Sequence, residues 1–253
     1  MAEAAIRDEA PAATLKVRRH WSRRLAGELA TLLVALMILL SIGLVLLDTA
    51  PGHRWLVDRL QEVETKSGLR FRIGRIEGSI FGESRLRNFQ VLDRDGVFLT
   101  SPEVRLDWSP AAWLTNSLRI DRLEADRVRL ERLPKLRPTG RRGPILPGFD
   151  IRIGKLEIRR LELARAVTGK PQVGRLSGSA DIRSGRALIA LDGALQGGDW
   201  LRVKLDAEPD GNRFDLDVRA SAPANGLLPA LFGSKRPLQL IVEGDGSWTR
   251  WRG

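Results

Sequence analysis

The chain has 253 residues, of which 43 % are hydrophobic and 29 % charged, so it is long and apolar enough to bury a core. It contains no Cys, which excludes disulfides, thiolate metal sites and Cys nucleophiles. The formal net charge of +11 suits an anionic partner, although Arg and Lys on solvated strand faces explain it equally simply. No basic helix interleaved with aromatic residues is visible, so we expect no nucleic-acid partner.

Residues 29–47 form an apolar run without a charge, after an Ala-rich polar segment of residues 1–28. A helix of this length spans about 28 Å, close to the hydrocarbon thickness of a bilayer. The run exceeds the apolar core of a signal peptide, which favours a retained transmembrane anchor. More cations precede it than follow it. This bias predicts that residues 1–28 lie in the cytoplasm, and residues 48–253 in the periplasm of a bacterium whose inner membrane holds the anchor.

Residues 52–66 follow the anchor and have the spacing of a short amphipathic helix. Trp55, Leu56, Leu60 and Val63 fall on one stripe of it, and Ser67-Gly68 ends it. Because the segment carries few cations, we expect it to cap the first strands of a sheet rather than lie on the membrane surface.

From Leu69 onward the apolar period is two, which predicts β-strands. Asp95-Gly96 indicates a hairpin turn, and the acidic residue that would close a calcium loop there is missing. Residues 173–220 are predicted to form a meander, and residues 238–242 another strand, with one helical turn at 227–232 between them. No capping element follows the last strand, so we expect a repeat array that continues past Gly253.

Two segments, residues 118–133 and 151–163, repeat the pattern apolar-x-apolar-x-x on a five-residue step. A strand keeps such a pattern on one face only if each step absorbs one extra residue, as a β-bulge or a short corner does. The sequence therefore predicts two bent strands, each with an apolar face and a cationic face. Pro-rich residues 134–147 between them are predicted to be a loop.

No catalytic motif is recognisable. Gly78-Ser79 does not have the spacing of a nucleophile elbow, and Gly169-Lys170 lacks the upstream glycine of a phosphate loop. The only histidines, His20 and His53, flank the apolar run on opposite sides and cannot share a metal. Carboxylates that alternate with Arg, such as Asp126, are expected to form cross-strand charge pairs on a wet face. We expect a binding protein, conduit or scaffold without cofactor or metal, and not an enzyme.

Three stretches carry a family resemblance: residues 68–80 after the short helix, residues 106–114 (LDWSPAAWL), and residues 118–134 ending in Arg132-Leu133-Pro134. With the single N-terminal anchor, this part of the chain resembles the N-terminal part of the TamB family, inner-membrane subunits of translocation and assembly modules, in the wider AsmA-like group. The resemblance covers about residues 25–253 and is sharpest at residues 106–114.

The resemblance implies a mainly β fold, an elongated folded sheet with an apolar groove, that spans the periplasm toward an outer-membrane β-barrel partner of the TamA type. It implies a role in outer-membrane biogenesis, through phospholipid passage, outer-membrane protein assembly, or both. The region that would contact the barrel is absent here. The alternative is a membrane-anchored β-sandwich scaffold that binds outer-membrane protein substrates without carrying lipid.

The apolar pattern alone is compatible with an open groove and with the core of a closed sandwich. The resemblance favours the groove. The residues predicted to line it are Leu118, Ile120, Leu123, Val128, Leu130, Ile151, Ile153, Leu156, Ile158 and Leu161.

Overall fold

The computed structural model describes residues 34–39, 41–62, 68–135, 146, 148–247 and 250–253. The chain divides into two compact units, residues 1–46 and 47–253, which are described separately. The predicted cytoplasmic tail lies outside the described residues, as do parts of the predicted anchor and most of the predicted Pro-rich loop.

The described residues of the first unit, 34–39 and 41–46, are helical. Across the described part of the chain, no single helix is both long and apolar enough to cross a membrane. The helix that ends at Leu47 meets that test of length and composition only jointly with Ala50–Arg59.

The described residues of the second unit form one open sheet of 12 strands, joined by short helical segments. The helical segments are α2 (Ala50–Glu62), the 3-10 helix η1 (Pro110–Thr115), α3 (Arg165–Thr168) and α4 (Leu227–Leu231). The strands are β1 (Arg70–Arg72), β2 (Arg75–Gly78), β3 (Glu83–Asp93), β4 (Gly96–Ser109), β5 (Ser117–Leu130), β6 (Asp150–Leu163), β7 (Gln172–Arg183), β8 (Arg186–Leu195), β9 (Trp200–Glu208), β10 (Arg213–Ala222), β11 (Leu238–Ser247) and β12 (Arg250–Arg252).

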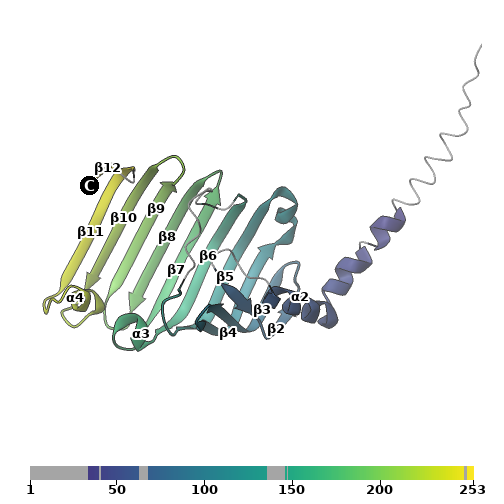
Figure 1. Cartoon of the computed structure of the whole chain (residues 1–253), viewed down its shortest axis with the longest axis horizontal. Coiled ribbons are helices and arrows are strands. Elements are labelled where there is room, and N and C mark those ends of the chain that lie inside the picture. The colour runs from purple at the N-terminus through teal and green to yellow at the C-terminus, as the bar shows by residue number, and fades with distance from the viewer. Residues whose placement is uncertain (1–33, 40, 63–67, 136–145, 147, 248–249) are drawn as a thin grey trace, which may run out of the picture. The chain divides into compact units, whose positions relative to one another are not determined.

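The strands lie side by side in chain order from β3 to β12, with β1 and β2 both paired to β3 (Figure 1). Neighbouring strands are antiparallel, and the one parallel pair in the described sheet is β5 with β6. The prediction of a mainly β fold is confirmed. So are the hairpin turn between β3 and β4 and the three turns of the meander from β7 to β10.

The predicted bulges are present in the register. Between Ile153 and Leu156, strand β6 advances three residues while β7 advances two, and the same happens between Ile158 and Leu161. Strand β5 gains one residue on β4 between Ile120 and Arg122. Both five-residue steps of β6, and the first step of β5, therefore absorb one extra residue, and the apolar positions return to the same face.

Helix α2 packs on β1 and β2, as predicted, and Leu56 of the predicted stripe is half-buried, whereas Val63 and the side chain of Leu60 lie outside the described residues. Among its described side chains the buried ones are His53 and Val57, and Val57 packs with Ile73 and Ile76. Trp55 was assigned to the buried stripe and is instead 54 % exposed, with the Arg59 guanidinium 5.9 Å from its ring centroid. The expectation was wrong for Trp55, because the helix turns His53 and Val57 toward Ile73 and Ile76 and leaves Trp55 on the side away from them.

Candidate functional site: the apolar face of the sheet

Cross-strand pairing arranges the apolar residues of β5 to β11 in rows that run across the strands. Each residue in a row is the direct partner of the next, so the whole row lies on one face of the sheet. The middle row consists of Ile120, Ile153, Ala180, Ile189, Leu205 and Leu216, and ends at Gly244.

Further apolar rows lie beside the middle row on the same face. On one side lie Leu118, Ile151, Ile182, Ala187, Ala207 and Phe214. On the other side lie Leu123, Leu156, Gly178, Leu191, Val203, Val218 and Val242, followed by Ala125, Ile158, Leu176, Gly193, Leu201, Ala220 and Leu240. We call the face that carries these rows the apolar face.

Exposure on the apolar face depends on side-chain size. In β6 to β11, all of whose strand residues are described, the buried hydrophobic residues are alanines only: Ala187, Ala207, Ala220 and Ala222. The larger Ile, Leu, Val and Phe side chains of the rows are half-buried, and Leu201 is 44 % exposed. In the core of a closed sandwich the large side chains would be the most buried.

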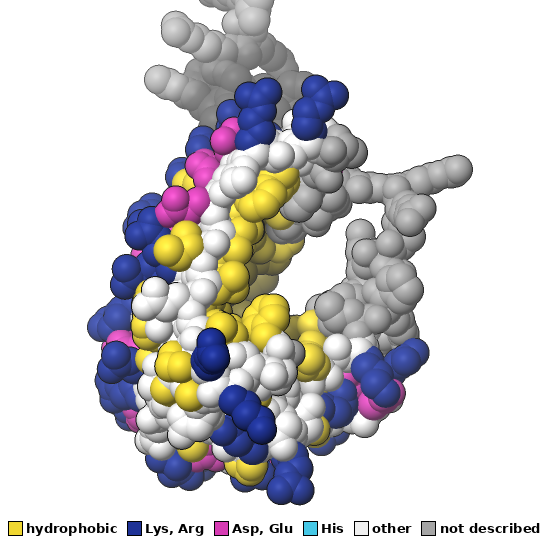
Figure 2. All heavy atoms as spheres, turned by 90° about the vertical axis from the view of Figure 1, so that its left-hand side faces the viewer, with side chains coloured by type: hydrophobic (Ala, Val, Ile, Leu, Met, Phe, Trp, Pro, Cys, Tyr) yellow, Lys and Arg dark blue, Asp and Glu magenta, His cyan; other side chains and the backbone are white. Residues whose placement is uncertain are grey.

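Figure 2 shows the same distribution in space. Hydrophobic side chains gather along the inner side of the curved sheet and face a hollow, while Lys, Arg, Asp and Glu occupy the outer side. Among the described residues no second sheet lies against the apolar face, because all strands belong to one sheet.

The structure brings the ten predicted lining residues together on the apolar face of β5 and β6. The two strands pair in parallel with their repeats in step, so that Leu118 is opposite Ile151, Ile120 opposite Ile153 and Leu123 opposite Leu156. Nine of the ten are half-buried. Val128 is the exception at 5 % exposed, in a small core with Val104 and Ala125.

Sequence analysis missed the continuation of these rows across the rest of the sheet. Ala180, Ile189, Leu205 and Leu216 belong to strands that were predicted, but they were not assigned to the site. The two-residue alternation of each strand shows that its apolar residues share one face. The sequence does not show the register between strands, which decides that these faces all lie on the same side of the sheet.

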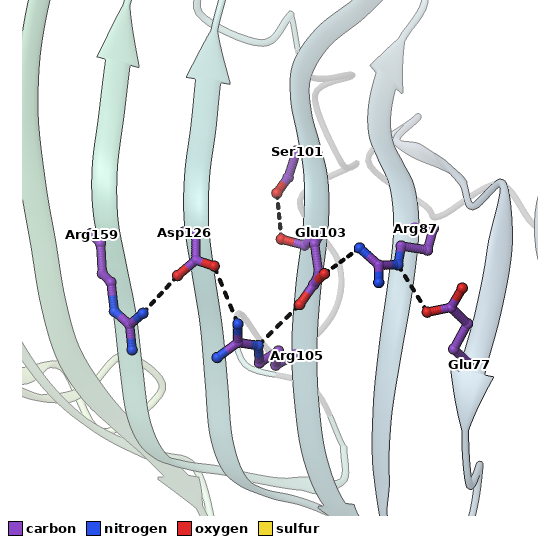
Figure 3. Close-up of polar contacts among 7 residues, drawn as sticks. All are labelled: Glu77, Arg87, Ser101, Glu103, Arg105, Asp126 and Arg159. Carbon is purple, nitrogen blue, oxygen red and sulfur yellow. Dashed lines mark hydrogen bonds and ion pairs between the residues drawn. The ribbon is translucent and has the colours of Figure 1, made fainter.

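The outer side of the sheet carries a ladder of alternating charges (Figure 3). Its members, from β2 to β6, are Glu77, Arg87, Glu103, Arg105, Asp126 and Arg159. The Asp126 carboxylate accepts hydrogen bonds from Arg105 at 3.2 Å and from Arg159 at 2.8 Å. The hydrogen bond from Arg87 lowers the pKa of Glu77 below its ordinary value. The prediction of cross-strand charge pairs on a wet face is confirmed, and it places the charged side chains opposite the apolar face.

Two carboxylates among the described residues are buried, Asp93 and Asp199, and the more deeply buried one, Asp93, lies at the turn between β3 and β4. Asp93 is fully buried and accepts two hydrogen bonds of 2.6 Å from the Arg132 guanidinium, which also lies 5.9 Å from the ring centroid of Phe98. The backbone N–H groups of Asp95 and Lys135 donate to the same carboxylate. The hydrogen bonds from Arg132 hold the pKa of Asp93 well below its ordinary value, against the cost of burial. This pair fixes the segment that leaves β5 against the β3–β4 turn.

A second polar cluster joins the start of α2 to the turn after β2. Asp48 accepts hydrogen bonds from the Ile80 backbone N–H at 2.8 Å and from the Ser79 hydroxyl at 2.9 Å, and these lower its pKa. His53 lies with Nε2 3.4 Å from Asp48 and Nδ1 3.2 Å from the Ile76 carbonyl. The Ser79 hydroxyl donates to Asp48 and not to His53, so the three side chains do not form a nucleophilic triad. No group of metal-ligating side chains occurs among the described residues.

Comparisons with family models, with curated proteins and with solved structures found no match for this chain.

Proposed function

We propose that this protein is a membrane-anchored periplasmic component of outer-membrane biogenesis, and that its apolar face is a groove for phospholipid acyl chains. The observation that carries the proposal is the exposure pattern of β6 to β11, where the only buried hydrophobic residues are alanines and the larger apolar side chains of the rows are half-buried. An extended apolar surface of this kind marks a binding site for an apolar ligand or partner.

The dimensions of the rows suit acyl chains. Neighbouring strands lie about 4.8 Å apart, so a row from β5 to β11 extends over about 29 Å. One leaflet of a bilayer contributes about 15 Å of hydrocarbon, half of the whole core. A row is therefore longer than an acyl chain as it lies in a membrane. Because the rows run across the strands without a charged residue, a chain could move from strand to strand with little change in environment.

The test is photo-crosslinking in cells. A crosslinker at Ile153 or Leu156, half-buried on the apolar face of β6, should capture phospholipid. The matched control is Arg159 on the same strand, which is exposed and paired with Asp126 on the outer side. Lipid capture at Arg159 equal to that at Ile153, or none at any of the three positions, would reject the groove.

The membrane position is part of the proposal and has its own test. The apolar run of residues 29–47 and the cations before it support a single anchor with the N-terminus in the cytoplasm. A Cys at Ala4 should resist an impermeant thiol reagent in spheroplasts, and a Cys at Thr139 should react. The natural chain has no Cys, so each variant has a single reactive site. The opposite labelling pattern would overturn the localisation.

The resemblance to the TamB family adds an outer-membrane β-barrel partner, of the TamA type, to the proposal.

A second function, a scaffold that guides outer-membrane strands by edge pairing, is favoured by one observation. In the described sheet, β12 pairs only with Asp245, Gly246 and Ser247 of β11, which leaves the outer edge of residues 238–244 without a strand. Such an edge can accept an extended peptide. A crosslinker at Gln239, exposed on β11, should then capture unfolded barrel protein. Protein at Gln239 without lipid at Ile153 would support the scaffold over the groove.

A further inference from the structure

The connection between β4 and β5 is unusual in this charged chain. Residues 109–118 contain no charged side chain, although 29 % of the whole sequence is charged. The 3-10 helix η1 lies inside this stretch and has no buried residue. Two large apolar side chains project at its end, Trp113 at 63 % exposed and Leu114 at 89 %. We call residues Pro110–Thr115 the apolar tip.

Local contacts hold the apolar tip in a defined conformation. Asn116 adopts a left-handed backbone conformation that ends η1, and its N–H donates to the carbonyls of Ala112 and Trp113. Its side-chain amide donates to the Gly148 carbonyl at 3.0 Å, and the Trp113 ring contacts Phe149 at 6.1 Å between centroids. These contacts fix the turn next to the start of β6, so Leu114 is exposed in a defined conformation.

The apolar tip lies at the same ends of the strands as the point where the chain enters the sheet from the proposed anchor. Asp48, directly after the apolar run, is hydrogen-bonded to Ser79 and Ile80 in the turn before β3. The first residue of β3, Glu83, pairs with Asp107, two residues before the end of β4. The turn that holds Asp48 and the start of η1 are thus at the same ends of neighbouring strands.

We propose that the apolar tip inserts Trp113 and Leu114 into the surface of the membrane that holds the anchor, as a second contact of the domain with that membrane. Trp prefers the bilayer interface, where its ring is buried and its N–H stays near water. The absence of charge over residues 109–118 removes the desolvation cost that a cation or carboxylate would add. The covalent link to the anchor enters the sheet at Asp48, at the same ends of the strands as the tip, and this link raises the effective concentration of the tip at the lipid surface.

The occupant we infer is a phospholipid surface and not a protein, because the two side chains project from a convex turn rather than line a pocket that a protein side chain could fill. The inference rests on the anchor that belongs to the proposed function. It is independent of the groove, since the tip lies outside the apolar rows.

The experiment uses the full chain reconstituted in liposomes with an environment-sensitive fluorophore on a single introduced Cys. Leu114→Cys places the label at the tip, where high exposure makes the substitution harmless to packing. Asp210→Cys is the matched control, exposed in the β9–β10 turn. Ala207 and Phe214 flank that turn and lie in the same row as Leu118, which follows the tip. The control position therefore lies at the same ends of the strands as the tip.

The label at Leu114 should shift to the blue and lose most of its emission when the liposomes contain lipids with a quencher near the headgroups. The label at Asp210 should keep its emission. Equal quenching at the two positions, or shielding of the Leu114 label from aqueous iodide without quenching by lipid, would overturn the inference; the latter would indicate a protein contact. If the Leu114 label is not quenched selectively, but the chain floats with the liposomes and a crosslinker at Ile153 still captures lipid, then the inference about the tip is wrong and the proposed function stands. A chain that does not float refutes the anchor and the tip together.

Discussion

A charge placed on the apolar face distinguishes an open surface from a covered core. We consider Ile153→Asp, in the middle row on β6, and compare it with Val128→Asp on the neighbouring strand β5. Ile153 is half-buried, whereas Val128 is 5 % exposed and packed with Val104 and Ala125. Both substitutions introduce the same side chain at strand positions, so the difference between them measures the environment.

The expected magnitudes follow from burial. Removal of an Ile side chain costs about 1.5–3 kcal/mol when it is fully buried, so a half-buried Ile153 should cost about 1–2 kcal/mol. An aspartate on an open face reaches water and adds little to this cost. At Val128 the loss of packing is joined by the burial of an unpaired carboxylate, which costs several kcal/mol more. The total approaches the roughly 5–15 kcal/mol by which whole domains are stable.

The assay is thermal unfolding of the full chain in detergent, followed by tryptophan fluorescence, for which the chain has seven tryptophans. A domain of this size loses about 2–4 °C of Tm per kcal/mol. Ile153→Asp should therefore unfold only about 2–8 °C below the unsubstituted chain, and Val128→Asp should be unfolded or far less stable. If Ile153→Asp is as damaging as Val128→Asp, the middle row is a covered core and the exposure argument for a groove is wrong.

Three further predictions concern the sheet itself. The lowered pKa of Asp93 contributes stability that is complete above its unfolded value of about 4 and is lost as the pH falls below it, so the Tm should fall between about pH 4 and 2, and less so in Asp93→Asn. Gly178→Ala should destabilise by about 1–3 kcal/mol, because a Cβ there would lie 2.3 Å from the Ala190 carbonyl oxygen, whereas Gly193→Ala, with 3.7 Å of space, should change stability by less than about 1 kcal/mol; urea titrations measure both. Asp126→Asn, on the exposed charge ladder, should shift the Tm by no more than about 2 °C, and a larger shift would show that the ladder is structurally important.

The five-residue step is the feature that sequence predicted in most detail. A strand with that step needs one extra residue per unit, and the register of β6 against β7 contains that residue at both expected places. The hairpin and meander turns were predictable for a similar reason, since Gly, Asp and Pro mark local backbone requirements. These features depend on short stretches of the chain, so they can be predicted directly from the sequence.

Parallel pairing of β5 with β6 could not be predicted in the same way. The repeat indicates two similar strands but gives no direction for their pairing, because direction depends on the connection between them, which the repeat does not specify. The burial of His53 rather than Trp55 on α2 has a similar origin. A helical stripe shows which residues could be buried, and the extent of β1 and β2 decides which of them are.

The in-step pairing of β5 with β6 also explains how the apolar face stays continuous through a bent part of the sheet. In the parallel register the residues that pairing skips, Asp121 and Asp126 on β5, stand beside Gly154 and Arg159 on β6. Because both strands take up their extra residues at the same level, neither loses phase with the other, and Ile120 and Leu123 remain opposite Ile153 and Leu156. In this pair, where both strands have the five-residue step, an extra residue taken up by only one of them would place an apolar residue of one strand beside a charged residue of the other. The repeat thus allows the sheet to curl while every row remains apolar, which is the geometry that an acyl chain lying along the rows requires.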